Sequence, residues 1–235
     1  MGIIKKDNKT VPGTYQEISD HVAKLKTILF TVNARGGSGF LHSLLDNDPQ
    51  ILTIPQFATI WDYCTGSDLP SPETIAARFY RRNIEFFESR LLEMERFHEL
   101  GENGDQSVIV CRKTFTNHFV NLLEAGPTNE GRVFRCAHAA YALTIGQDPM
   151  SAKVIFYHQH NVESLTQVIC PIDENYSRLH ITRDPRIGLV RYTESLKSKK
   201  IVWGFSGANY FTDDEYASAS RLFANIRTVI EQVQI

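Results

Sequence analysis

An apolar strand, a glycine-rich turn and a helix follow one another near the N-terminus, and this unit constrains the fold most. Residues 27–32 are apolar and partly β-branched, which is typical of a buried strand. A turn with three glycines follows at 34–40, and the pattern at 40–45 predicts a helix. A helix that directly follows a buried strand packs back on a parallel sheet, so the unit favours an α/β fold.

The rest of the chain alternates strand and helix signals. Short apolar runs predict further strands at 50–54, 107–111, 153–157 and 178–181. Helical spacing of apolar residues predicts one long helix over 72–100, with Pro72 at its start, and other helices near 117–125, 134–146, 161–169 and 213–234. This alternation predicts a single three-layer α/β domain over 1–235, with a mainly parallel central sheet and right-handed crossovers.

Composition excludes several classes of protein. The 25 basic and 27 acidic residues give a net charge of −2, which does not favour nonspecific binding to nucleic acid. The four cysteines form no CxxC pair, so neither a disulfide scaffold nor a zinc cluster is indicated, and a reduced, cytoplasmic chain is expected. Residues 1–9 lack the apolar stretch of a signal peptide, and no apolar run is long enough for a transmembrane segment.

The glycine-rich turn has the features of an anion-binding loop. Its backbone N–H groups can converge on one anion, and the start of the following helix adds favourable partial charge. Arg35 contributes a planar donor fork that suits phosphate oxygens. The alternative is a tight strand-to-helix turn with a solvated arginine.

The turn differs from two well-known nucleotide-binding motifs. No lysine precedes Ser38, so the Walker A sequence is absent, and this argues against a kinase or nucleoside triphosphatase. The G-x-G-x-x-G pattern of dinucleotide-binding proteins is absent as well.

A second candidate anchor follows the strand at 178–181. The chain continues as Arg183-Asp184-Pro185-Arg186, in which Asp184 can cap a helix and Pro185 suits its first position. Ligands of parallel sheets bind at the carboxyl ends of the strands, so Arg183 is expected at the same edge as the glycine-rich turn. A surface salt bridge within these four residues is the alternative.

Together the two anchors resemble the sulfotransferase family. Residues 34–49 are similar to the family's 5′-phosphosulfate loop and following helix, and residues 183–186 are similar to its 3′-phosphate motif. The resemblance extends from about residue 27 to 200 and is strong only at the two motifs. It implies a P-loop-like fold and 3′-phosphoadenosine 5′-phosphosulfate (PAPS) as sulfuryl donor, without a metal. The donor-binding residues that it implies are Arg35, Gly36, Gly37, Ser38, Gly39, Phe40, Arg183 and Arg191.

The chain departs from the family pattern at several positions. Arg191 stands where the family has a serine, so that Thr193 or Ser195 is expected to supply the missing hydroxyl. Gly36 and Gly39 stand where hydroxyl residues are common. Relatives also continue beyond the helix expected at 213–234, so the chain is expected to be a short member or to lack a C-terminal portion.

Two histidines at the end of the strand at 153–157 are the candidate catalytic residues. In cytosolic members of the family a Lys-Thr-His motif ends this strand, and its histidine is the base. Here the sequence is His158-Gln159-His160, and His160 precedes Arg183 by 23 residues, which is a similar spacing. The resemblance therefore assigns His160 as general base and puts His158 in the lysine position, where it would act on the leaving group together with Arg35.

Other readings of the histidines stay open. The pair could bond only to backbone, or it could begin a metal site, although the sequence offers no further ligands at a suitable spacing. In Golgi-type relatives the base is a glutamate after the second strand, but the stretch here, 54–57, holds no carboxylate. His42 and His138 are expected to be structural or peripheral.

The function expected from the sequence is a PAPS-dependent sulfotransferase that acts on a hydroxyl or an amine. The class of the acceptor and the oligomeric state stay open. The alternatives are a P-loop kinase or nucleotide hydrolase with a degenerate loop, and a nucleotide-binding module without catalysis.

Overall fold

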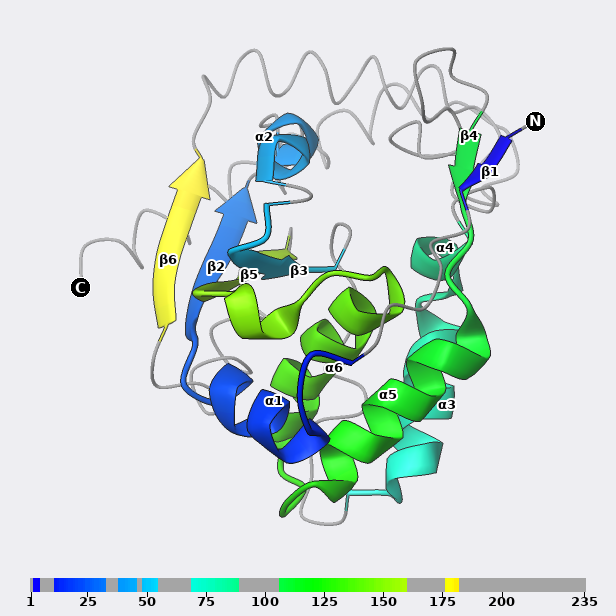
Figure 1. Ribbon diagram of the computed structural model, residues 1–235. Coiled ribbons are helices and arrows are strands. Elements are labelled where there is room, and N and C mark those ends of the chain that lie inside the picture. The colour runs from blue at the N-terminus through cyan, green and yellow to red at the C-terminus, as the bar shows by residue number, and fades with distance from the viewer. Residues whose placement is uncertain are drawn as a thin grey trace, which may run out of the picture.

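A four-stranded sheet, in which every strand runs parallel to its neighbours, organises the molecule (Figure 1). The computed structural model describes residues 2–4, 11–32, 38–45, 48–54, 69–88, 106–159 and 176–181. The sheet consists of β2 (Lys26–Val32), β3 (Ile51–Thr53), β5 (Val154–Gln159) and β6 (Tyr176–Ile181), in the order β3-β5-β2-β6. This confirms the expected α/β class and the parallel sheet.

The first predicted strand, β2, is an inner strand. It pairs with β5 on one side, where Lys26 is opposite Val154, and with β6 on the other, where Thr27 is opposite Tyr176. Successive side chains alternate between the two faces of a strand. Leu29 accordingly belongs to the main hydrophobic core, whereas Phe30, which is equally buried, stacks on Phe156 on the opposite face.

One face of the sheet is covered by a layer of helices (Figure 1). These helices are α1 (Tyr15–Val22), α3 (Pro72–Arg82), α5 (Arg112–Glu124) and α6 (Glu130–Thr144). Helix α6 lies next to the sheet, and the ring of its Phe134 packs edge-on against Tyr157 of β5 at 5.3 Å between centroids. Side chains from Val133 to Thr144 are all buried, because α1 and α5 cover the sides of α6 that the sheet leaves open.

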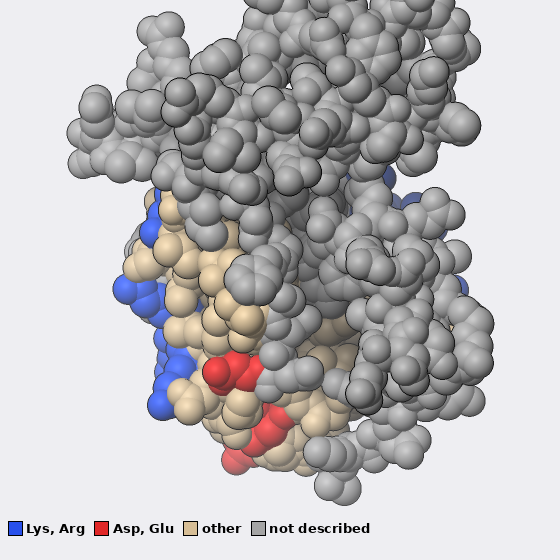
Figure 2. All heavy atoms as spheres, turned by 90° about the horizontal axis from the view of Figure 1, so that it is seen from above, with Lys and Arg blue, Asp and Glu red and all other residues tan. Residues whose placement is uncertain are grey.

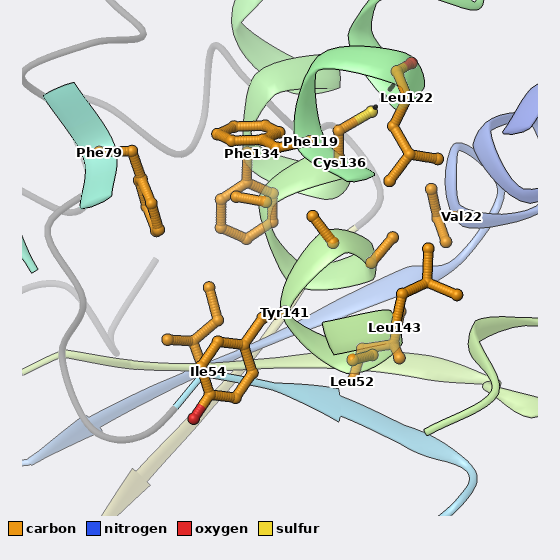
Figure 3. Packing of buried hydrophobic residues seen from close by; sticks show 14 of the residues in the cluster. Val22, Leu52, Ile54, Phe79, Phe119, Leu122, Phe134, Cys136, Tyr141 and Leu143 are labelled. Carbon is orange, nitrogen blue, oxygen red and sulfur yellow. Dashed lines mark hydrogen bonds between the residues drawn. The ribbon is translucent and has the colours of Figure 1, made fainter. Parts of the chain in front are cut away.

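The core forms where α6 meets its neighbours (Figure 3). Phe134, Tyr141 and Leu143 of α6 belong to one cluster with Leu52 of β3, with Ile54, which follows β3, and with side chains of the outer helices. Four alanines let the helix approach its neighbours closely: Ala137, Ala139, Ala140 and Ala142.

The other face of the sheet carries α2 (Ser38–Leu45), near the ends to which the arrowheads of β2 and β6 point (Figure 1). Its His42 ring packs edge-on against Phe156 of β5 at 5.6 Å. Side chains alternate between the two faces along β5, and the neighbours of Phe156, Ile155 and Tyr157, face the helical layer. Helix α2 and helix α6 therefore contact opposite faces of the same strand.

Three smaller elements complete the described part of the chain. Strand β1 (Gly2–Ile4) pairs in parallel with β4 (Gln106–Val108), a pairing that the sequence did not predict. Helix α4 (Ile84–Phe87) follows α3, and a 3-10 turn, η4 (Pro149–Ser151), precedes β5. Among the described residues, no helix has the length and apolar character needed to cross a bilayer.

The single long helix predicted over 72–100 is wrong. Helix α3 ends at Arg82, and Asn83 leaves the helical conformation with φ −115° and ψ 29°. The side-chain amide of Asn83 donates to the Phe79 carbonyl at 2.9 Å, and such bonds from asparagine compete with helical backbone bonds. After α4, Glu88 pairs with Ile109 in an antiparallel bridge.

The strand predicted over 107–111 is shorter than expected. β4 ends at Val108, and Cys111 is already the residue that precedes the first turn of α5. The first turn of α5 is Arg112-Lys113-Thr114, whose polar side chains give no apolar periodicity, so the start of this helix was missed. The helices expected at 161–169 and 213–234 lie outside the described residues.

Candidate functional site

Three of the predicted site segments follow the carboxyl ends of adjacent strands. Val32, the last residue of β2, is opposite Ile181, the last residue of β6. On the other side of β2, Thr31 is opposite Gln159, the last residue of β5. The carboxyl ends of three adjacent strands therefore lie side by side, with the end of β2 between those of β5 and β6. Parallel sheets bind their ligands at these strand ends.

The predicted site residues are described only in part. Helix α2 begins at Ser38, so Ser38, Gly39 and Phe40 form its first turn, and the predicted change from strand to helix is confirmed. The first N–H groups of a helix have no acceptor within the helix and are available to other partners. His158 is described in full. The other candidates lie outside the described residues: Arg35, Gly36, Gly37, His160, Arg183, Arg191, Thr193 and Ser195.

His158 lies in a buried group of side chains from four elements. Its ring is 1% exposed and packs against Phe30 of β2 at 4.8 Å between centroids. Its Nδ1 is 3.2 Å from Nδ1 of His42 on α2. His42 Nε2 is in turn 3.1 Å from the hydroxyl of Thr53 on β3. The helix that follows the glycine-rich turn is thus joined to two strands by polar contacts.

Of the two roles expected for His42, the structure therefore supports the structural one and not the peripheral one. Burial lowers the pKa of His42 to about 4, so the ring is neutral at pH 7 and carries one N–H. The sequence holds no local signal for this contact, because His42 and His158 are 116 residues apart. His42 and His158 come into contact only because the fold places α2 over β5.

His138 has the structural role that was expected. It is fully buried in α6, and its Nδ1 bonds to the Phe134 carbonyl at 2.9 Å. Since a carbonyl only accepts, Nδ1 carries the proton. Burial lowers the pKa of His138 to about 4.

A second polar pair, which the sequence analysis missed, joins β2 to β6. The Thr31 hydroxyl is 2.7 Å from Nδ1 of His180. Burial, and to a lesser extent the charge of Arg178, lowers the pKa of His180. Thr31 and Phe30 are consecutive, so their side chains lie on opposite faces of β2. The Thr31–His180 pair is therefore separate from the His42–His158 pair.

Neither a metal cluster nor a reactive buried thiol is found in the described part of the chain. No three His, Cys, Asp or Glu side chains gather there in a way that could hold a metal ion. Burial raises the pKa of the Cys136 thiol to about 11, so that this side chain packs as a neutral group among core residues.

The described surface carries charges of both signs. In the view from above, Lys and Arg side chains gather along one flank, and Asp and Glu lie close by among neutral residues (Figure 2). This distribution agrees with the near balance of basic and acidic residues in the sequence.

No protein-family model matches the chain, and no curated protein or solved structure matches it either.

Proposed function

We propose that the protein is a sulfotransferase, which moves a sulfuryl group from PAPS to a hydroxyl or amine acceptor. The observation that carries the proposal is the register of the sheet. It brings the ends of β2, β5 and β6 side by side, with Val32 opposite Ile181 and Thr31 opposite Gln159. The glycine-rich segment, the histidine pair and the Arg-Asp-Pro-Arg segment each follow one of these ends in the sequence.

The proposed division of roles follows the chemistry of the donor. Sulfuryl transfer releases adenosine 3′,5′-bisphosphate, and negative charge builds on its 5′-phosphate. The N–H groups of 36–40 and the Arg35 guanidinium would stabilise that charge. Arg183 and Arg191 would bind the 3′-phosphate, and His160 would accept the proton of the acceptor. Sulfuryl transfer of this kind needs no metal ion.

The start of α2 supports this reading of the turn. The helix begins at Ser38, directly after Gly36 and Gly37, which is the arrangement that presents N–H groups to an anion. The same arrangement would serve a triphosphate or a module without catalysis, so the deciding property is which nucleotide binds.

A ligand panel read as thermal stabilisation tests the proposal. A ligand at 100 times its dissociation constant stabilises the native state by about 2.7 kcal/mol. For a protein of this length that energy corresponds to a rise of roughly 5–10 °C in the unfolding midpoint. We expect this rise with adenosine 3′,5′-bisphosphate in the absence of magnesium.

Two controls separate the proposal from its competitors. A larger shift with magnesium-ATP, together with no shift from the bisphosphate, would favour a kinase or hydrolase. Stabilisation by the bisphosphate without transfer from PAPS to a panel of phenols, alcohols and amines would favour a binding module.

A further inference from the structure

A directed series of hydrogen bonds runs from His158 into the end of β3. It passes from His158 to His42, then to the Thr53 hydroxyl, and ends at the Ile54 carbonyl. The three side chains that take part are buried, at 1%, 4% and 7% exposure for His158, His42 and Thr53. Buried polar groups of this kind stay paired, so each bond in the series constrains the next.

The donor and the acceptor of each bond can be assigned by starting from the final acceptor, the Ile54 carbonyl. A carbonyl oxygen only accepts, so the Thr53 hydroxyl donates its one proton to Ile54, at 3.3 Å. The Thr53 oxygen must then accept from His42, which puts the His42 proton on Nε2. Burial keeps the His42 ring neutral, with its pKa at about 4, so its Nδ1 carries a lone pair. His158 must therefore donate to that atom from its own Nδ1.

We propose that His42 and Thr53 are positioning residues, which hold His158 with its proton on Nδ1 and leave its Nε2 as a proton acceptor. The role of this acceptor in sulfuryl transfer rests on the proposed function above. The tautomer itself rests on the hydrogen bonds and on the burial of His42, which keeps that ring neutral.

This assignment changes the role of His158. If His158 had the role of the lysine in the family's Lys-Thr-His motif, it would have to donate a hydrogen bond to the leaving group. His158 is 1% exposed, and burial disfavours a charged imidazole. A neutral ring with its proton on Nδ1 has no N–H at Nε2 to donate. A lone pair at Nε2 instead suits a general base.

In this form of the proposal His158 takes the place of His160 as the base, and the transfer step balances. The acceptor oxygen forms a bond to sulfur while the bond from sulfur to the 5′-phosphate oxygen breaks, and the bonding electron pair leaves with the phosphate. The acceptor's proton moves to Nε2 of His158, which becomes an imidazolium. Its Nδ1–H still faces the lone pair of neutral His42, and this bond, now charge-assisted, stabilises the new cation.

Imidazole ¹⁵N spectra of the full chain without ligand test the tautomers directly. We expect His158 to show a protonated Nδ1 and an unprotonated Nε2, and His42 to show the reverse. A spectrum in which His158 carries its proton on Nε2 would overturn the proposal.

Two matched threonine-to-valine substitutions, at Thr53 and at Thr31, show whether the tautomer of His158 depends on Thr53. Thr53→Val removes the acceptor of the His42 proton, so the share of His158 with the proton on Nδ1, relative to the other tautomer, should fall roughly three- to tenfold. Thr31→Val removes a similarly buried hydroxyl that pairs with His180 on the other face of β2. It should change the His180 signals and leave His158 as it is.

The outcomes are distinct from those of the proposed function. Unchanged His158 signals in Thr53→Val would overturn the positioning role of Thr53 and His42. If the tautomers are as expected but adenosine 3′,5′-bisphosphate does not stabilise the protein, the arrangement of the histidines holds and the sulfotransferase proposal fails.

Discussion

Arg135 of α6 carries a buried charge that binds carbonyl groups at the C-terminal end of helix α1. Its Nη1 donates to the carbonyls of Val22 and Leu25, at 2.9 and 2.7 Å. Both carbonyls lie at or just beyond the end of α1, where helical acceptors are left unsatisfied. A residue on α6 thus stabilises the end of another helix, and this contact ties α1 to the central helix.

Arg135→Met should therefore destabilise the fold. The substitution keeps most of the packing volume but leaves the two carbonyls without their charged donor. We expect the free energy of unfolding in urea to fall by about 2–4 kcal/mol. Arg78→Met on the exposed side of α3 is the control and should change it by less than about 0.5 kcal/mol. Equal effects of the two changes would refute the role given to Arg135.

Arg183 belongs to the proposed donor site and calls for a different measurement. Arg183→Ala should weaken binding of adenosine 3′,5′-bisphosphate by roughly 10- to 150-fold, the contribution of a charge-assisted hydrogen bond. Binding of adenosine 5′-phosphosulfate, which lacks the 3′-phosphate, should change much less. Equal losses in calorimetric titrations of both nucleotides would show that Arg183 does not read the 3′ end.

At the residue scale, the sequence predicted candidates but not contacts. His158 could be singled out because it follows an apolar run near a second histidine. Its partner His42 could not, since their 3.2 Å contact depends on α2 lying over β5. The same reason hid the bond between Thr31 and His180, which exists only because β2 and β6 are adjacent.

Helix α6 shows at the scale of an element how small side chains allow full burial. Its N-cap is Asn129, whose side chain accepts from the Arg132 N–H at 2.8 Å. Its alanines leave room for the sheet on one side and for α1 and α5 on the others. A helix surrounded in this way has no face on which extra volume fits.

Ala140→Leu should test that packing. Ala140 is fully buried, so three added carbons must displace neighbours, and we expect a loss of about 1–3 kcal/mol in the free energy of unfolding. Ala77→Leu on the exposed side of α3 is the matched control and should be close to neutral. If Ala140→Leu is also neutral in urea titrations, then α6 is less tightly enclosed than the structure indicates.

Elements with strong local signals were predicted well. The strand at 27–32 and the helix at 40–45 correspond to β2 and α2 within two residues at each end. The failures came where one side chain overrides the pattern, as at Asn83, or where a helix begins with exposed polar residues, as α5 does. The order of the strands could not be predicted, because it depends on pairing between distant segments.

For the molecule as a whole, the buried neutral histidines make stability depend on pH. His42 and His138 have pKa values of about 4 in the folded state, below the ordinary 6.5 of an unfolded chain. On acidification the unfolded state therefore binds these protons first. Stability from both residues is present above pH 6.5 and is lost as the pH falls from 6.5 towards 4.

We expect each of the two histidines to account for a loss of about 2 kcal/mol in the free energy of unfolding between pH 7 and pH 5. His138→Leu removes one titrating group, so the variant should lose less stability over this range than the parent. Urea titrations at the two pH values measure the difference. Parallel pH dependence in parent and variant would show that His138 does not titrate as described.

The central position of β2 also bears on how the chain folds as it is synthesised. The partners of β2 come much later, since Lys26 pairs with Val154 and Thr27 with Tyr176, at separations of 128 and 149 residues. Both edges of this apolar strand therefore stay open while the ribosome makes more than half of the chain. Closing loops of this length before any pairing forms slows folding, and an unpaired apolar strand invites contact with other chains. The arrangement that brings three strand ends together thus also leaves the nascent chain prone to aggregation until its second half has been made.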